Sequence, residues 1–242
     1  MDIDLAKIKL TSARKDITIP VKYNPAQILK LVIEIGKKLM PVKYDKEGKL
    51  IEFTLEGPRM ALAIQLVYYF FNDPAFEGNL SSGLWIHGRK GTGKTMLLRI
   101  FREMSFNGLI PTGKGYNLAY CSDIAQEYEA KGAGCLGKYH EPVIRIENNI
   151  DRVYATNWAF DDLGSENLKA NHFQNVRNVM QEILDARYRR YIELGSLTFI
   201  TTNLNQEIIE SKDFYNVRIG DRFHEMFNDI KLDGPSLRPQ AQ

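Results

Sequence analysis

The residue types that can do chemistry are concentrated in GRKGTGKT, residues 88–95, which lies between two apolar runs. Gly88, Gly93, Lys94 and Thr95 fit the spacing G-x-x-x-x-G-K-[ST] of a phosphate-binding loop. Glycines let the backbone point its N–H groups at phosphate oxygens, and the helix that follows adds the positive end of its dipole. The spacing predicts that Lys94 reaches the β- and γ-phosphates of ATP and that the Thr95 hydroxyl binds Mg²⁺. The predicted nucleotide-binding residues are Gly88, Arg89, Lys90, Gly91, Thr92, Gly93, Lys94, Thr95 and Met96. The alternative is a surface turn rich in glycine and lysine.

Two carboxylates follow a second apolar run in WAFDDLG, residues 158–164. Because successive side chains of a strand point to opposite faces, Asp161 and Asp162 cannot share one role. We expect Asp161 to hold Mg²⁺ opposite Thr95, and Asp162 to polarise the water that attacks the γ-phosphate. The alternative is an Asp-Asp turn that only ends a strand.

The next apolar run ends in Thr201, Thr202 and Asn203. An amide can donate a hydrogen bond to a γ-phosphate oxygen and orient water without adding charge. Asn203 is therefore a candidate catalytic residue. The alternative is that Asn203 caps a helix over LNQEIIE.

Three arginines come late in the chain, at Arg218, Arg222 and Arg238. Arg218 and Arg222 are one helical turn apart and share a face. Such arginines suggest phosphate sensing, and one supplied to a neighbour's ATP makes hydrolysis depend on assembly. Arg222 and Arg238 complete the predicted catalytic set with Asp162 and Asn203. For Arg222 the alternative is a salt bridge to the nearby Glu225 or Asp221.

Strands and helices must alternate to bring these motifs together. Expected strands cover 84–86, 116–121, 157–162, 196–203 and 228–234, and expected helices start near Asn24, Pro58, Lys94, Ser122 and residue 171. A hairpin is expected over 42–56, irregular structure over 131–150, and one long helix over 171–194.

This alternation predicts an α/β fold, a parallel sheet sandwiched by helices with its ligands at the carboxyl ends of the strands. Residues 58–242 are expected to form the nucleotide-binding domain. Residues 1–57 form a small extension, which either packs on that domain or docks a partner.

The composition is that of an ordinary globular protein, with 44% hydrophobic and 26% charged residues among 242. No apolar run is long enough to span a bilayer and the N-terminus is no signal peptide, so we expect a cytoplasmic protein. Cys121 and Cys135 lack metal-type spacing and are expected to be reduced. The net charge of +2 neither demands nor excludes nucleic acid.

The motifs GRKGTGKT, FDDLG-x-E, TTNL, R-x-x-DRF and G-x-S-x-R occur in that order over about residues 60–238. This order resembles the DnaC/IstB-like branch of AAA+ ATPases, which includes helicase loaders and ATPase partners of transposases. The resemblance implies that Asp161 is the Walker B acid, Asn203 sensor 1, Arg222 the arginine finger and Arg238 sensor 2. It also implies that a C-terminal helical lid domain is lacking, and the chain stops four residues after Arg238.

The sequence departs from the family pattern in three places. The apolar run before Asp161 is short and holds Asn157. Asn216 stands where the family usually has glycine, and the first 57 residues resemble no known loader domain. Glu166 matches an acid of the family whose role the sequence does not specify.

The leading hypothesis is an ATP-hydrolysing switch that assembles as a homo-oligomer, binds DNA, and works with a replicative helicase or a transposase. The alternatives are a stand-alone P-loop NTPase or small-molecule kinase, and a regulatory ATPase ring with protein partners only. A small-molecule kinase would need an arginine-rich lid segment, which the sequence lacks.

Single-stranded DNA would need cations and aromatic rings on one surface. KGAGCLGKYH offers Lys131, Lys138, Tyr139 and His140 without local acids, although the alternative is a solvated loop. A rival basic patch lies on the expected long helix, at Arg187, Arg189 and Arg190.

Overall fold

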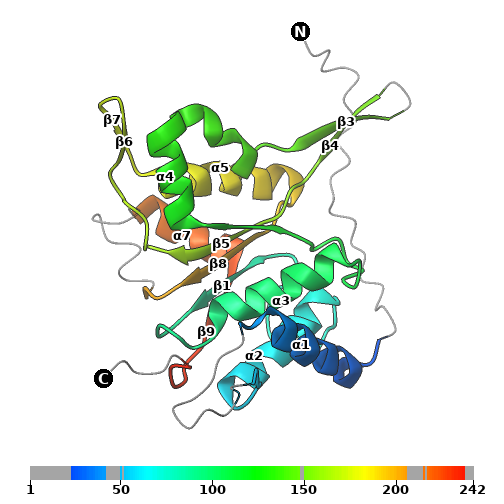
Figure 1. The fold of residues 1–242 in the computed structure, drawn as a ribbon. Helices are drawn as coiled ribbons and strands as arrows, with labels where there is room; N and C mark the ends of the chain where they lie inside the picture. Colours follow the sequence, from blue (N-terminus) through cyan, green and yellow to red (C-terminus); the bar gives the residue numbers. More distant parts are fainter. Residues whose placement is uncertain are drawn as a thin grey trace, which may run out of the picture.

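The structure is a computed structural model that describes residues 23–41, 50, 52–147, 150–205, 215 and 217–237 (Figure 1). Residues 42–49 and 51 of the expected hairpin and the site residue Arg238 lie outside these described residues.

A five-stranded sheet with the order β2-β5-β8-β1-β9 forms the centre of the molecule. Its strands are β1 (Gly83–His87), β2 (Asn117–Tyr120), β5 (Trp158–Leu163), β8 (Thr198–Thr202) and β9 (Phe227–Lys231). Every neighbouring pair is parallel, so the carboxyl ends of all five strands meet at one edge. The expected α/β fold, a P-loop core with a parallel sheet sandwiched by helices, is confirmed.

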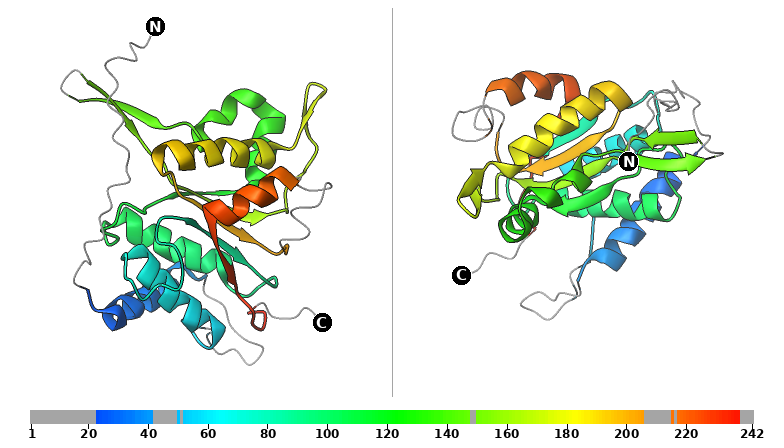
Figure 2. Two further views of the ribbon diagram at one scale, coloured as in Figure 1. Left: turned by 180° about the vertical axis from the view of Figure 1, so that it is seen from behind. Right: turned by 90° about the horizontal axis from the view of Figure 1, so that it is seen from above.

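Helices cover both faces of this sheet, as Figures 1 and 2 show. One layer contains α1 (Pro25–Leu39), α2 (Pro58–Phe70) and α3 (Lys94–Phe106), and the other α4 (Cys121–Lys131), α5 (Val179–Leu194) and α7 (Val217–Met226). The alternation of side chains along β1 builds both cores, because Leu84 and Ile86 pack with the first layer and Trp85 with the second.

Helix α1 belongs to the first of these cores. Asn24 caps it by accepting a hydrogen bond from the Ala26 N–H at 3.0 Å, as its position before Pro25 predicts. Val32 and Ile35 are buried, and the ring of Phe53 packs so closely on α1 that a Cβ at Gly36 would lie 2.3 Å from it. The part of the N-terminal segment that is described therefore packs on α2 and α3.

Three expectations about local structure are wrong. Residues 131–150 contain two short 3-10 turns and the strand β3 (Val143–Glu147), which pairs with β4 (Ile150–Tyr154) in a projecting hairpin. The expected long helix over 171–194 begins only at Val179, because β6 (Ala170–His172) and β7 (Asn175–Arg177) form an antiparallel hairpin. Ser122, which the sequence predicts as the cap of a helix over residues 124–130, does not cap α4, since its hydroxyl donates to Asp123 instead.

Both cysteines are free thiols, as expected. Within the described part of the chain, helices are too short or too polar to cross a membrane.

Candidate functional site

The glycine-rich loop adopts a conformation that needs its glycines. Gly88 and Gly91 have φ of 134° and 84°, and Cβ atoms there would lie 2.3 Å from the Leu232 carbonyl oxygen and 2.2 Å from the Ser236 hydroxyl. The Leu237 N–H donates to the Gly91 carbonyl at 2.9 Å. The chain that leads to position 238 therefore runs along the loop.

Lys94 begins α3 and directs its ammonium group across the loop. The Nζ donates to the carbonyl oxygens of Gly88 and Arg89 at 2.7 and 2.9 Å, and to Asn203 Oδ1 at 2.9 Å. Lys94 is only 6% exposed. A buried cation at the mouth of this loop is suited to bind phosphate oxygens.

Asp161 lies beside Thr95, at the end of β5. The Thr95 hydroxyl donates to Asp161 Oδ1 at 2.9 Å, and the Thr201 hydroxyl donates to the same oxygen. Burial raises the pKa of Asp161, and the hydrogen bonds from Thr201 and Thr95 act in the opposite direction. Thr201 also accepts a hydrogen bond from the Asp162 N–H at 3.0 Å, so one hydroxyl holds both acids.

Asp162 has other partners than Asp161, but the alternation of a regular strand does not separate them, because the backbone at Asp162 is left-handed. Its φ of 58° coincides with a shift in the register of β5 against β8. Asn203 Nδ2 donates to Asp162 Oδ1 at 2.6 Å, so Asn203 bridges Lys94 and Asp162. The role of Asn203 as a helix cap lies outside the described residues, because 206–214 are not described.

The hydroxyl of Thr95 and the carboxylate of Asp161 form a pair of oxygen ligands next to the loop, and this donor set fits Mg²⁺. Mg²⁺ typically takes one or two protein oxygens and completes its shell with water and phosphate. Over the described ranges, no group of three His, Cys, Asp or Glu side chains could form an all-protein metal cage.

A cavity of about 300 Å³ adjoins the loop and is lined by Lys94, Thr95, Asp162 and Asn203. On its other side it is lined by residues that the sequence motifs did not indicate, Met40, Phe53, Leu55 and Arg59. The Nη1 of Arg59 is buried and has no hydrogen-bond partner among the described residues. Local pattern around the loop could not have found these residues, because Met40 follows α1, Phe53 and Leu55 precede α2, and Arg59 lies on α2.

Glu166 has a structural contact that the sequence could not supply. Its Oε2 accepts a hydrogen bond from the Gly164 N–H at 2.7 Å, and its Oε1 accepts one from the Tyr215 hydroxyl. Both side chains are buried. Glu166 therefore ties the turn after the two acids to the segment that precedes α7.

The structure does not bring Arg222 to the loop. Its guanidinium pairs with Asp185 of α5 and lies 4.7 Å from the centre of the Tyr188 ring. Glu225, one of the two expected alternative partners, instead accepts from the Tyr188 hydroxyl at 2.8 Å. Arg218 lies on α7, but its side chain and that of Asp221 are outside the described set. The roles of Arg222 and Arg238 stay predictions.

The expectation that KGAGCLGKYH lacks local acids is wrong. Glu127 of α4 pairs with Lys131 and Lys138 at 3.1 and 2.6 Å, and it accepts a hydrogen bond from the Tyr139 hydroxyl. The hydrogen bond from Lys138 is the largest cause that lowers the pKa of Glu127 to about 2. Glu127 lies outside this segment, on α4. The segment folds back against α4, so Glu127 becomes a neighbour of its lysines.

The basic patch expected on the long helix, now α5, does not present all three of its arginines at the surface. Arg187 is fully buried and donates to Thr198 Oγ1 and to the carbonyl oxygens of Thr156 and Leu197 at 2.5–2.9 Å. It therefore cannot contribute to a surface. Arg190 pairs with Glu193 at 2.8 Å.

No protein-family model matches the chain, and no curated protein matches it. Among solved structures, DnaI is 20% identical with a TM-score of 0.49, over 83% of this chain and 95% of that chain. The DnaC helicase loader is 15% identical with a TM-score of 0.49, over 75% of this chain and 94% of that chain. AMPPCP-bound DnaA from Aquifex aeolicus is 20% identical with a TM-score of 0.43, over 81% of this chain and 52% of that chain. At these identities and TM-scores the likeness concerns the general fold alone.

Proposed function

We propose that the chain is an ATP-binding and ATP-hydrolysing switch of the AAA+ type. The observation that carries this proposal is a set of hydrogen-bonded groups that follow three neighbouring strands. Thr201 joins its two parts, because its hydroxyl donates to Asp161 and accepts from the Asp162 N–H. Lys94 bonds to Asn203, Asn203 bonds to Asp162, and Thr95 bonds to Asp161. Open parallel sheets bind their ligands at the carboxyl ends of the strands, and these side chains lie at that edge of the sheet.

Each member of this set has a role in phosphoryl transfer. Lys94 binds the β- and γ-phosphates, while Thr95 and Asp161 hold Mg²⁺, which neutralises charge on the phosphates when bound. Asp162 polarises the attacking water, and Asn203 orients it without adding charge. The apolar wall with Phe53 and the Arg59 Nη1, which has no partner among the described residues, suit the base and sugar of the nucleotide.

The switch acts in DNA replication or transposition, either as a DnaC-like helicase loader or as an IstB-like partner of a transposase. The order of motifs over residues 60–238 supports this reading. ATP between subunits favours a homo-oligomer on DNA, in which Arg222 and Arg238 serve phosphates, and hydrolysis releases it. This requires only that the two states differ in affinity for DNA.

The test is the ATPase rate of the intact chain with and without single-stranded DNA, at several protein concentrations. The proposal expects DNA to stimulate hydrolysis and the rate per subunit to rise with concentration. A rate indifferent to both, together with a phosphorylated small molecule, would instead identify a small-molecule kinase. Capture of a replicative helicase or of a transposase by the ATP-bound chain decides between the two DNA processes.

A further inference from the structure

The β6–β7 hairpin presents an aromatic ring to solvent. Phe173 and Gln174 form a two-residue turn between the paired His172 and Asn175. Phe173 is 92% exposed, and its described aromatic contact is with the neighbouring ring of His172. Val176, two residues after the turn, is 57% exposed.

The turn does not need this phenylalanine. Phe173 and Gln174 have φ of 45° and 67°, which is left-handed backbone. Two-residue hairpin turns with two positive φ values favour Asn-Gly, and bulky residues rarely occupy them. Phe173 therefore opposes the geometry of its own turn, and such outliers are more common where a side chain has a function.

The hairpin is held firmly against α4, whereas its tip projects from the molecule (Figure 1). The Tyr128 hydroxyl donates to the Asn175 carbonyl at 2.8 Å, and His172 Nδ1 lies 2.9 Å from the Glu129 carbonyl oxygen. Ala170 is fully buried, and a Cβ at Gly132 would lie 2.8 Å from the His172 ring. The ring of Phe173 is thus carried on an anchored element.

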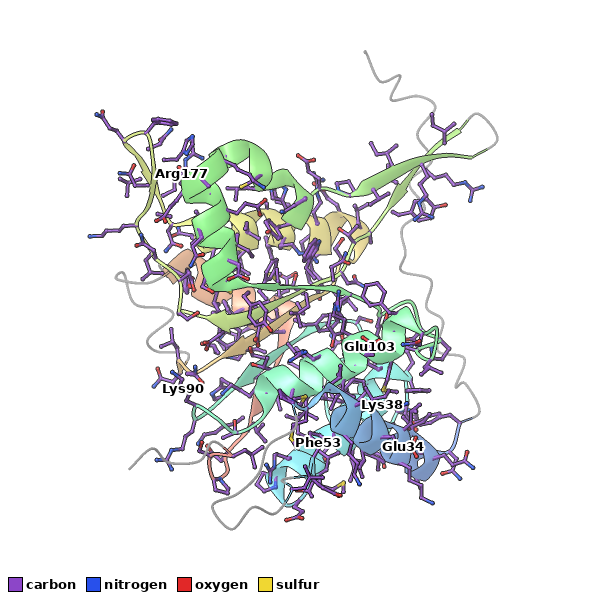
Figure 3. All side chains as sticks on the ribbon, in the orientation of Figure 1. Glu34, Lys38, Phe53, Lys90, Glu103 and Arg177 are labelled. Carbon is purple, nitrogen blue, oxygen red and sulfur yellow. The ribbon has the colours of Figure 1, made fainter. Side chains whose placement is uncertain are left out.

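The side chains around Phe173 are cationic or amide-bearing. Residues 168–178, LKANHFQNVRN, contain no acid. The exposed residues on either side of the turn are Lys169, Asn171, Asn175 and Val176. Arg177 adds a half-exposed cation at the base of the hairpin, where Figure 3 shows it beside α4.

The acids of the adjoining helices are already engaged. Glu182 pairs with Arg177 at 3.0 Å, and Glu129 accepts a hydrogen bond from Asn167 at 2.8 Å. A protein-docking site would surround the ring with further large apolar side chains, but Val176 alone has that character here. Cations and amides next to an exposed ring instead match phosphates and bases.

We propose that the tip of the β6–β7 hairpin binds single-stranded nucleic acid, with a base stacked on Phe173 and Lys169 beside the phosphates. The inference rests on the proposed function and names the residues of its DNA contact. Strand β5, which carries Asp161 and Asp162, runs through residues 164–169 into this hairpin. The proposed nucleic-acid contact and the nucleotide site therefore lie on one continuous segment of the chain.

The experiment compares two glycine variants of the full chain, Phe173→Gly and Gln174→Gly. Both relieve a left-handed position, so both should unfold at the wild-type temperature or above. The probe is a fluorescent oligothymidylate, and its anisotropy is titrated with Mg²⁺ and a non-hydrolysable ATP analogue. Phe173→Gly should bind about 5- to 150-fold more weakly, the value of one stacked base, whereas Gln174→Gly should bind as wild type does to within about threefold.

Two further measurements separate stacking from charge. An abasic oligonucleotide lacks the stacking partner, so wild type and Phe173→Gly should bind it equally. Phe173→Trp should retain affinity for the normal strand, and Phe173→Gly should leave the salt slope unchanged. Lys169→Ala should reduce that slope by about 0.7.

Equal affinity of Phe173→Gly and Gln174→Gly for the oligothymidylate would overturn the inference and leave the proposed function intact. So would a loss that persists on the abasic strand. Unchanged DNA binding with lost capture of a protein partner would assign the ring to a protein pocket instead. If the wild type binds no strand in any nucleotide state, the DNA part of the proposed function fails as well.

Discussion

Tyr215→Phe removes a single hydroxyl from the buried contact that joins the turn after the two acids to α7. Glu166 is 7% exposed, and its two oxygens accept from the Gly164 N–H and the Tyr215 hydroxyl. Phenylalanine fills almost the same volume as tyrosine. The variant therefore removes a donor from a buried carboxylate and creates almost no cavity.

The expected loss follows from the charge on the acceptor. A hydrogen bond to a charged group contributes about 1.5–3 kcal/mol, so the free energy of unfolding should fall by about that much at neutral pH. Burial raises the pKa of Glu166, and the Tyr215 hydrogen bond acts against this, so the variant should raise that pKa further.

The sign of the pH dependence follows from this shift. A carboxyl whose folded pKa is raised contributes most stability below its unfolded pKa, about 4.3, and loses it as pH rises through the folded value. The difference between wild type and variant should therefore shrink toward acidic pH. Near pH 4 it should approach about 0.5–1.5 kcal/mol, the contribution of a neutral hydrogen bond.

Urea unfolding of both proteins from about pH 4 to about pH 7 measures this difference. The matched control is Tyr116→Phe, because the buried Tyr116 hydroxyl donates to the neutral carbonyl of Leu98 at 2.6 Å. Its loss should not vary with pH. If Tyr215→Phe shows the same pH-independent loss, the coupling to an ionised Glu166 is refuted.

Three other substitutions test separate parts of the structure. Arg187→Met should lower the free energy of unfolding by about 3 kcal/mol or more, because it leaves three acceptors, two of them buried, without their donors. The exposed Arg189→Met should change it by no more than about 0.5 kcal/mol, and equal urea midpoints would contradict this contrast. Asp162→Asn should bind ATP but hydrolyse it poorly and trap the assembled state; near-normal turnover would assign the reaction to Glu166 or another acid. Arg222→Ala should abolish ATP-dependent self-association in analytical ultracentrifugation, and a wild type that stays monomeric with a non-hydrolysable analogue would refute the role in trans.

The sequence predicted those parts of the site that are built from contiguous residues. The spacing from Gly88 to Thr95 determines a turn and a helix start through local backbone geometry, and the structure has both. The apolar runs before Asp161 and Asn203 are β5 and β8, which pair in parallel. Residues that end neighbouring parallel strands must lie close together, so the contacts among them follow from the topology.

Contacts between distant segments could not be predicted in this way. Lys138 and Glu127 meet because the chain folds back on α4, and Arg187 is buried because its helix packs on the loop before β8. Local composition shows neither the contact of Lys138 with Glu127 nor the burial of Arg187. It therefore overstated the exposed positive charge of residues 131–140 and of α5. The β6–β7 hairpin was missed because its apolar residues continue the helical spacing of α5, while its turn has neither glycine nor proline.

Calorimetric titration of wild type and Lys94→Ala with ATP and Mg²⁺ tests the nucleotide site most directly, with the exposed Lys131→Ala as the control for loss of one positive charge. The wild type and Lys131→Ala should bind ATP with the same affinity. Lys94→Ala should weaken binding at least about 30-fold, because truncating one partner of a buried charge pair costs about 2–5 kcal/mol. An unchanged affinity for ATP in Lys94→Ala would contradict the account.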